Sequence, residues 1–360
     1  MCSISLTLDA LSRLISFKYQ QTRMALNLPT TLKLAQLKLL AFKCGISTSG
    51  TKPILITRLQ DEITRTPRQQ PSPLRILSID MGIRNLAYCC IDVPKSLPNR
   101  LPSIRAWHRL AVSTTPEELE VKPDDGVETI PIKEVFNPAT LSSAAYTLLR
   151  KKLLLENPTH ILIERQRFRS MGSRNILEWT VRVNMFESIL YAILCTLKGE
   201  GVWNGDVQAI APGKVGPFWV GEEIDGAESK KERKSKSAKI RNKGAKIDLV
   251  RSWLENDDMV RLGNKAVENM ARRYREKWDR SPGGRRKGEV DGEEKMGKLD
   301  DLADCLMQGM AWIEWEENKR KALEHGVEAL LGPEAVVKPS PLTMMPVRRS
   351  RSIKNPVRQR

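Results

Sequence analysis

The stretch RILSIDMGIRNLAYCCIDV, residues 75–93, constrains the fold more than any other part of the chain. An apolar run ends on an acid, Asp80, and a second apolar run extends from Leu86 to Val93. Two such runs joined by a short turn predict two buried neighbouring strands. Gly82 lets the backbone turn tightly beside Asp80 and leaves room there for a phosphate group. The stretch raises the question of why a buried strand should end on a carboxylate.

Two further acidic segments resemble this one in character. The strand-like run THILIERQRFRS ends its apolar part on Glu164, and a helical pattern, KLDDLADCLMQGMAWIEW, carries Asp300, Asp301 and Asp304. At about 100° per residue, Asp304 lies about 40° around that helix from Asp300 and about 60° the other way from Asp301. Asp304 is therefore central to the acidic cluster, and Asp300 and Asp301 compete to be its partner.

Acids in this order suggest a site for divalent metal ions. Carboxylates at the C-terminal ends of neighbouring parallel strands occupy the usual site position in an open α/β sheet, and a helix packed beside them can add more. Converging carboxylates repel each other unless cations bind, and hard oxygen ligands suit Mg²⁺ or Mn²⁺. Two such ions about 4 Å apart can activate a water and stabilise the leaving oxygen of a phosphodiester. A single acid at a strand end is more often a cap or turn former, so the combination carries the hypothesis.

The pattern from residue 74 onward predicts an α/β domain with a mixed five-stranded sheet flanked by helices. The expected strands cover 75–80, 86–93, about 103–113, 159–164 and about 206–211. The expected helices cover about 139–156, 174–198, a segment ending near 257, and about 299–319. The segments 114–138 and 258–297 look like insertions in this domain.

Composition restricts the class of partner. The 360 residues carry a formal net charge of +17, which favours a polyanion, most often nucleic acid, over a merely solvated basic surface. No run of about 18 or more apolar residues occurs, so no membrane partner is expected. The six cysteines form no C-x-x-C pair and no Cys/His cluster, and they are interpreted as buried thiols of a reducing compartment.

Four segments flank or precede the main domain, which is assigned to residues 74–320. Residues 1–27 are rich in Ser, Thr and Leu, with three basic residues against one acid, and resemble an amphipathic mitochondrial presequence; an ordinary N-terminal helix is the alternative. Residues 28–65 form a compact helical unit and 66–73 a Pro-rich linker. Residues 321–360 are expected to be a basic, disordered tail.

The helical unit at 28–65 has a recognisable pattern. Thr30 or Thr31 can cap a first helix that Gly45 ends, and Lys52-Pro53 opens a second helix after a turn containing Gly50. The leucines, the glycines, Lys52 and Arg58 together resemble a SAP motif, a small DNA-binding module. Lys52 and Arg58 would lie near a helix N-terminus, where phosphates are favoured. A plain helical hairpin is the alternative.

The acidic motifs together resemble the RuvC-like Holliday-junction resolvases of the RNase H-like superfamily, and more closely the fungal mitochondrial resolvases. The residues that carry the resemblance are Ser78-Ile79-Asp80-Met81-Gly82-Ile83-Arg84-Asn85-Leu86-Ala87, Ile163-Glu164-Arg165-Gln166-Arg167-x-Arg169, Lys298-Leu299-Asp300-Asp301-Leu302-Ala303-Asp304 and the stretch IAPGKVGPFW at 210–219. The resemblance covers roughly residues 28–320.

The resemblance implies an activity and a set of site residues. Asp80, Glu164 and Asp304 would hold Mg²⁺ or Mn²⁺, two ions per site, with Asp300 or Asp301 as the fourth ligand. The family implies a homodimer that binds a four-way DNA junction and nicks two opposed strands symmetrically. It also implies a role in the recombination and segregation of mitochondrial DNA, and hence a matrix, nucleoid-associated location.

Basic residues and one helix would complete this assembly. The helix at 174–198 could form the dimer contact or simply pack on the sheet. The segment 229–246 could lie along a junction arm. The individual basic residues expected to contact DNA are Lys52, Arg58, Arg84, Arg165, Arg167, Arg169 and Lys214, of which Lys214 could reach the scissile phosphate.

Three other functions compete with a junction resolvase. The same carboxylates would serve another RNase H-like nuclease that cuts RNA in hybrids or other branched DNA. The positive charge, the helical unit and the tail would suffice for a non-catalytic protein that packages mitochondrial DNA, although the acids would then have no explanation. An RNA-processing factor with a degenerate nuclease fold is the third.

Overall fold

The structure is a computed structural model, and it describes residues 26–67, 72–95, 101–112, 136–166, 176–220, 236–279 and 299–331. The presequence expected at 1–27 lies outside these residues except for its last two. Most of the insertion expected at 114–138 also lies outside them, as do Arg167 and Arg169. The basic segment 229–246 is described only from residue 236, and its side chains only from Lys243.

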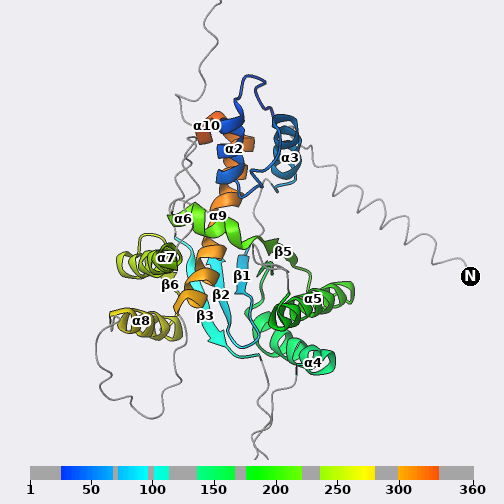
Figure 1. The fold of residues 1–360 in the computed structure, drawn as a ribbon, viewed down its shortest axis with the longest axis vertical. Helices are drawn as coiled ribbons and strands as arrows, with labels where there is room; N and C mark the ends of the chain where they lie inside the picture. The colour runs from blue at the N-terminus through cyan, green and yellow to red at the C-terminus, as the bar shows by residue number, and fades with distance from the viewer. Residues whose placement is uncertain are drawn as a thin grey trace, which may run out of the picture.

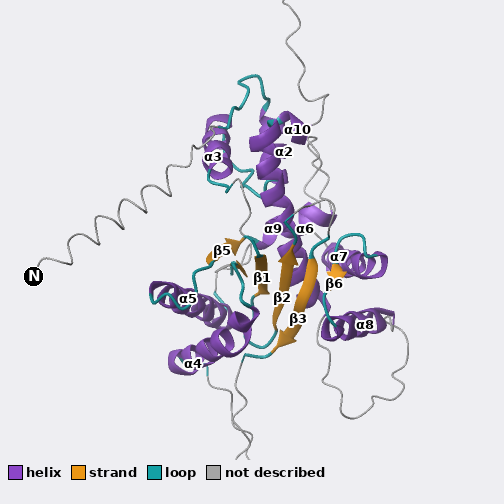
Figure 2. Ribbon diagram, turned by 180° about the vertical axis from the view of Figure 1, so that it is seen from behind, coloured by secondary structure: helices purple, strands orange, loops and turns teal. Residues whose placement is uncertain are grey.

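A mixed sheet forms the centre of the molecule (Figure 2). Its strand order is β5-β4-β1-β2-β3-β6; β1 pairs antiparallel with β2 and parallel with β4, β2 pairs antiparallel with β3, and β4 and β6 run parallel to β5 and β3 respectively. The bounds are β1 Leu74–Asp80, β2 Leu86–Val93, β3 Ser103–Leu110, β4 His160–Glu164, β5 Asp206–Ile210 and β6 Arg261–Leu262. The five predicted strands are all present, and the short β6 is a sixth strand that was not predicted.

Helices cover both faces of the sheet, and the strands alternate their side chains between them. One core contains Ile76 and Cys89 and is covered by α6 Pro212–Val220, α7 Lys236–Asn256, α8 Lys265–Asp279 and α9 Leu299–His325. The other core contains Leu77 and Cys90 and is covered by α4 Pro138–Leu148 and α5 Glu178–Gly199. Figure 1 shows α9 running across the sheet, with α7 and α8 to one side of it. A short π-helical segment, Leu149–Leu153, and a 3-10 turn, Leu154–Glu156, extend α4.

The segment 258–297, predicted to be an insertion, begins with regular secondary structure. It contains β6 and the helix α8 of about four turns, whose buried residues Val267, Ala271 and Tyr274 repeat at a helical spacing. The Tyr274 ring packs on Trp107 of β3 with their centroids 5.1 Å apart. The segment therefore covers the sheet beside β3 instead of leaving it.

Helix α5 is long and apolar enough to cross a membrane, and it is the one such helix in the part of the chain that the structure describes. Length and composition are weak grounds for a membrane span, because core helices pass the same test. Val183, Phe186, Leu190 and Leu194 of α5 are buried in the core shared with α4 and the sheet. These contacts agree with a core helix of the domain.

A smaller helical body stands at one end of the molecule (Figure 1). It contains α2 Leu34–Lys43 and α3 Lys52–Thr64, and the turn between them places Gly45 at φ +64°, in the left-handed region. The C-terminal part of α9 and α10, Glu328–Leu331, belong to the same body, which we call the helical module. Its core combines Leu37, Leu40, Leu55 and Leu59 with residues from the other end of the chain, Ala322, Val327 and Leu330.

This composite core corrects two predicted boundaries. The tail predicted from residue 321 is wrong for residues 321–331, because α9 continues to His325 and α10 follows it. Leu26, inside the predicted presequence, is also buried in the core of the helical module. Polar contacts join the two chain ends as well: Lys43 Nζ donates to the Leu330 carbonyl at 2.6 Å, and Asn318 Nδ2 donates to the Lys43 carbonyl at 2.8 Å.

The composite core predicts that a change near the C-terminus loosens helices near the N-terminus. We expect Leu330→Ala to lower the free energy of unfolding of the helical module by about 2–4 kcal/mol, because it leaves a cavity against α2. Hydrogen exchange at the amides of α2 and α3 measures this, with the exposed Glu328→Gln as the matched control. Unchanged exchange in α2 and α3 would contradict a shared core.

Candidate active site

Asp80 and Glu164 meet at one end of the sheet. They are the last residues of β1 and β4, which are parallel neighbours with Ile79 opposite Ile163. The alternation of side chains points both acids to the face that α9 covers, the same face as Ile76 and Leu162. The two carboxyl groups lie close enough to interact, and this contact is one of the causes that raise the pKa of Asp80.

Helix α9 brings the remaining acids to the same place. Its first two turns carry Asp300, Asp301 and Asp304. Burial raises the pKa of Asp80 well above its usual range, and the hydrogen bond and charge of Glu164 and the charges of Asp304 and Asp301 raise it further. Burial also raises the pKa of Asp304, although the ammonium of Lys246 acts in the opposite direction. The five predicted acids therefore form one electrostatically connected group.

Each of the three aspartates of α9 forms an ion pair with a basic residue of a neighbouring element. Lys246 Nζ of α7 lies 2.7 Å from Asp304 Oδ1, and Lys243, one turn earlier in α7, pairs with Asp300. Arg109 Nε of β3 lies 2.9 Å from Asp301 Oδ2, and the same guanidinium also bonds the Asn85 side chain in the turn after β1. These partners neutralise part of the negative charge that the acids bring together.

The basic partners explain the present arrangement of the acids. Among the described residues, no three His, Cys, Asp or Glu side chains converge closely enough to hold a metal ion. The partners draw Asp300 toward α7 and Asp301 toward β3, so these two neighbours face different ways. Asp301 acts on the charge of Asp80, whereas Asp300 acts on Asp304, so which of the two is the fourth ligand stays a prediction.

Sequence reasoning missed three members of this site. Lys243 and Lys246 fall inside a segment predicted to lie along DNA, yet in the structure both contact the acids of α9. Their spacing of three in a helical segment was the available signal, because such residues share a helix face. Arg109 had no local signal, since its partner Asp301 lies 192 residues away in the chain.

Hydrogen bonds from neighbouring elements fix the first two residues of the loop after Glu164. The Arg165 amide donates to the Ile210 carbonyl at 2.8 Å, and the Gln166 amide donates to Glu187 Oε2 of α5 at 3.0 Å. Burial raises the pKa of Glu187, although its bond to the Gln166 amide acts against the rise. The exposed Arg165 side chain therefore starts from a fixed backbone beside the acids.

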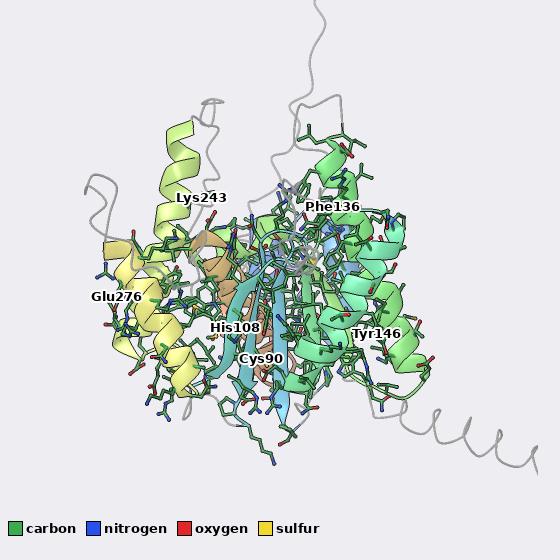
Figure 3. The ribbon with its side chains drawn as sticks, turned by 90° about the horizontal axis from the view of Figure 1, so that it is seen from below. Cys90, His108, Phe136, Tyr146, Lys243 and Glu276 are labelled. Carbon is green, nitrogen blue, oxygen red and sulfur yellow. The ribbon has the colours of Figure 1, made fainter. Side chains whose placement is uncertain are left out.

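Arg84 lies in the turn after β1 and rests on aromatic rings. Its guanidinium carbon is 5.0 Å from the Trp179 ring centroid and 5.6 Å from that of Phe136. Figure 3 shows Phe136 and Lys243 on opposite sides of the same end of the sheet. Arg84 thus lies at the rim of the acidic site, where cation–π contacts hold its side chain.

The other predicted DNA contacts have structural partners in the helical module. Lys52 Nζ donates to the Thr30 carbonyl at 3.1 Å, and Arg58 donates to the Ser47 and Ser49 carbonyls at 2.8 and 2.7 Å. Lys214 Nζ of α6 donates to the Gly45 carbonyl at 2.6 Å, and burial lowers its pKa. The Lys214 side chain therefore contacts the helical module, and its contact with a scissile phosphate stays a prediction.

Comparison with known proteins identifies the family. A protein-family model described as "Mitochondrial resolvase Ydc2 / RNA splicing MRS1" matches residues 76–322. This chain belongs to that family. The match includes Asp80 and Glu164 at the strand ends, Lys243 and Lys246 of α7, and the three aspartates of α9.

Relatives and a solved structure agree with this membership. Two relatives named "Cruciform cutting endonuclease 1, mitochondrial" are 26% identical: the Schizosaccharomyces pombe protein over 291 residues, 79% of this chain and 93% of its own, and the Saccharomyces cerevisiae protein over 321 residues, 81% and 84%. The fold is similar to that of the crystal structure of the yeast mitochondrial Holliday junction resolvase Ydc2, with a TM-score of 0.54 and 24% identity over 83% of this chain and 98% of that chain. The predicted RNase H-like α/β fold and the predicted family are confirmed.

Because the acids repel one another, we expect neutralisation of Asp80 to stabilise the metal-free protein against unfolding. An acid whose pKa is raised by folding binds more protons in the native state, so stability falls as pH rises through the interval between its unfolded and folded pKa values. In EDTA at neutral pH we expect Asp80→Asn to raise Tm, by about 2–4 °C for each kcal/mol of repulsion relieved.

Thermal unfolding at several pH values checks this expectation. The gain from Asp80→Asn should shrink as the pH falls toward the unfolded pKa of an aspartate, about 3.9. The exposed Asp206→Asn, remote from the acidic group on β5, serves as the control. A Tm for Asp80→Asn equal to or below that of the wild type at neutral pH would contradict electrostatic crowding at this site.

Proposed function

We propose that this protein is a divalent-metal-dependent endodeoxyribonuclease that resolves four-way DNA junctions in mitochondria by paired symmetric nicks. The observation that carries the proposal is the pairing of Asp80 with Glu164 at adjacent strand ends, faced by the acids of α9. An acidic site of this kind suits phosphodiester hydrolysis with bound cations. The formal net charge of the whole chain, +17, suits a polyanionic substrate.

The substrate and location follow from the relatives. Both curated relatives carry names that specify cruciform cutting, endonuclease activity and mitochondria, and the similar solved structure is titled a Holliday junction resolvase. A role in mitochondrial DNA recombination and segregation, with a matrix, nucleoid-associated location, is the corresponding proposal for this chain.

The acids fit Mg²⁺ or Mn²⁺. Asp80, Glu164 and Asp304 supply hard carboxylate oxygens. Burial and then the charges of the neighbouring acids raise the pKa of Asp80, and a bound cation would relieve the repulsion among them. These three residues, with Asp300 or Asp301, would hold two ions. When bound, such ions would supply Lewis-acid activation of a water and of a phosphodiester oxygen.

The basic residues of the site have two roles in this proposal. Lys243, Lys246 and Arg109 hold the acids of α9 through ion pairs and balance their charge. With cations bound to those acids, Lys243 and Lys246 would be available for backbone phosphates. Arg84 and Arg165 would position DNA at the rim of the site. The sequence predicts DNA contacts for Arg167 and Arg169 as well, which lie outside the described residues. The helical module would contact DNA phosphates through Lys52 and Arg58.

A homodimer would match the two-fold symmetry of a four-way junction. Helix α5 has an exposed side besides its buried one: Val181, Ala192 and Cys195 are exposed at a roughly helical repeat, and Leu177, just before the helix, continues that repeat. This largely apolar face suits a second copy. A monomer at micromolar concentration in sedimentation equilibrium would contradict the dimer.

Cleavage of a labelled mobile four-way junction in Mg²⁺ is the direct test. We expect paired symmetric nicks by the wild type and a loss of at least about 100-fold with Asp80→Asn, because a metal-binding carboxylate is removed. Junction binding by the variant should survive, since phosphate contacts come from other residues. Linear duplex and an RNA–DNA hybrid of the same sequence are the substrate controls.

Each other outcome assigns the protein to a competing function. The family description also includes RNA splicing, so a nucleic-acid-binding member without cleavage is a real alternative. Tight junction binding with no nick in Mg²⁺ or Mn²⁺ would favour packaging. Preferential cutting of the hybrid would favour a different RNase H-like nuclease.

A further inference from the structure

A buried polar contact lies in the apolar interface between α9 and the sheet. Gln308 of α9 is 3% exposed, and its Nε2 donates to Ser78 Oγ at 3.0 Å and to the Ile79 carbonyl at 3.2 Å. The Leu162 carbonyl of β4 also accepts from this nitrogen at 3.5 Å. One amide group therefore touches both strands that end on the paired acids.

The position of this contact relative to the acids is fixed by the geometry of the elements. Ser78 precedes Asp80 by two residues in β1, so both side chains are on the same face of the sheet. Gln308 follows Asp304 by four residues, about one turn of α9, so both point to that face. The contact between Ser78 and Gln308 is thus a polar layer directly behind the layer in which Asp304 faces Asp80 and Glu164.

The helix also approaches the sheet closely at this level. A Cβ atom on Gly309 would lie 2.7 Å from Ile91 Cδ1 and 3.3 Å from Ser78 Cβ. Both distances are shorter than ordinary van der Waals contact, so a larger residue would require the Ile91 and Ser78 side chains to shift. Gly309 therefore permits the short separation at which the Gln308 amide reaches Ser78.

The buried amide of Gln308 and hydroxyl of Ser78 lie where apolar side chains would otherwise pack. The surrounding core residues are apolar, among them Ile76, Cys89, Ile91, Cys305 and Leu306. Burying polar groups costs free energy that hydrogen bonds only roughly offset. Apolar contacts are non-directional, whereas a hydrogen bond requires a defined distance and angle. The polar contact therefore restricts sliding and rotation of α9 on the sheet more than apolar packing alone.

We propose that Gln308 is a positioning residue for DNA cleavage: through Ser78 and the backbone of β1 and β4, it fixes the register of α9 so that Asp304, Asp80 and Glu164 act as one cation-binding set. This inference rests on the proposed function. It predicts that loss of the amide weakens metal binding without weakening DNA binding, because Gln308 is buried and the expected phosphate contacts are at the surface.

The test compares Gln308→Met, which keeps the side-chain length and removes the donor, with the wild-type protein. We expect Mn²⁺ affinity, measured by calorimetry on the DNA-free protein, to fall about 10-fold, within the range for groups that orient metal ligands. The maximal rate of junction cleavage should fall about 10–100-fold, since a misplacement of about 1 Å can have that effect. Junction affinity in EDTA should stay within about 2-fold of wild type, since phosphate contacts supply it.

A matched control comes from the next turn of the same helix. Trp312 Nε1 donates to Gln208 Oε1 of β5 at 2.7 Å, which is another hydrogen bond between α9 and the sheet, farther from the acids. Trp312→Phe should lower stability but leave Mn²⁺ affinity and cleavage rate near wild type. Equal losses of Mn²⁺ affinity in both variants would overturn the positioning role and indicate a general loss of packing.

Ser78→Ala keeps the inference testable if Gln308→Met does not fold. It removes one acceptor and leaves the Ile79 and Leu162 carbonyls for the amide, so we expect a smaller loss of Mn²⁺ affinity of about 3-fold. Folded Gln308→Met or Ser78→Ala protein with wild-type Mn²⁺ affinity, beside a wild type that cuts junctions, would overturn this inference alone. A wild type that neither binds Mn²⁺ nor cuts would overturn the proposed function and the inference with it.

Discussion

Repulsion among carboxyl groups gathered at one end of the sheet is the constraint on which the site depends. Asp80 and Glu164 end adjacent strands, and burial, the contact with Glu164 and the charges of Asp304 and Asp301 raise the pKa of Asp80. Such a group is stable in a folded protein when protonation or nearby cations balance its negative charge. Lys243, Lys246 and Arg109 supply part of that balance within the chain, and the remainder is the physical argument for bound divalent ions.

Helix α9 connects this site to the rest of the molecule. Its first turns carry the acids, its middle packs on β1 and β2, and its last turns enter the core of the helical module. Trp315, in the same helix, lies against Gly45 of the turn between α2 and α3, where an added Cβ would lie within 2.2 Å of its ring. A single continuous helix thus joins the proposed DNA-binding module to the acids and fixes the position of one relative to the other.

Local patterns predicted the parts of the site that local sequence determines. Buried runs ending on Asp80 and Glu164 identified two strand ends, and the apolar stripe around Asp304 placed that acid on a helix. Pairings between distant segments had no such signal: Arg109 with Asp301, Lys246 with Asp304, and Leu330 with the core around α2 all depend on tertiary structure. The same reason accounts for β6, whose two residues become a strand only by pairing with β3. The sequence also contained no sign that Lys214 donates to a backbone carbonyl of the helical module.

The location of a bound cation tests the central claim most directly. A crystal of the wild-type protein soaked in Mn²⁺ and measured at the manganese absorption edge would show the ion by its anomalous scattering. The account predicts an anomalous peak between the carboxylates of Asp80, Glu164 and Asp304, lost in crystals of Asp80→Asn. A peak elsewhere, or an Asp80→Asn crystal that keeps the peak at full height, would contradict the assignment of these acids as the metal ligands.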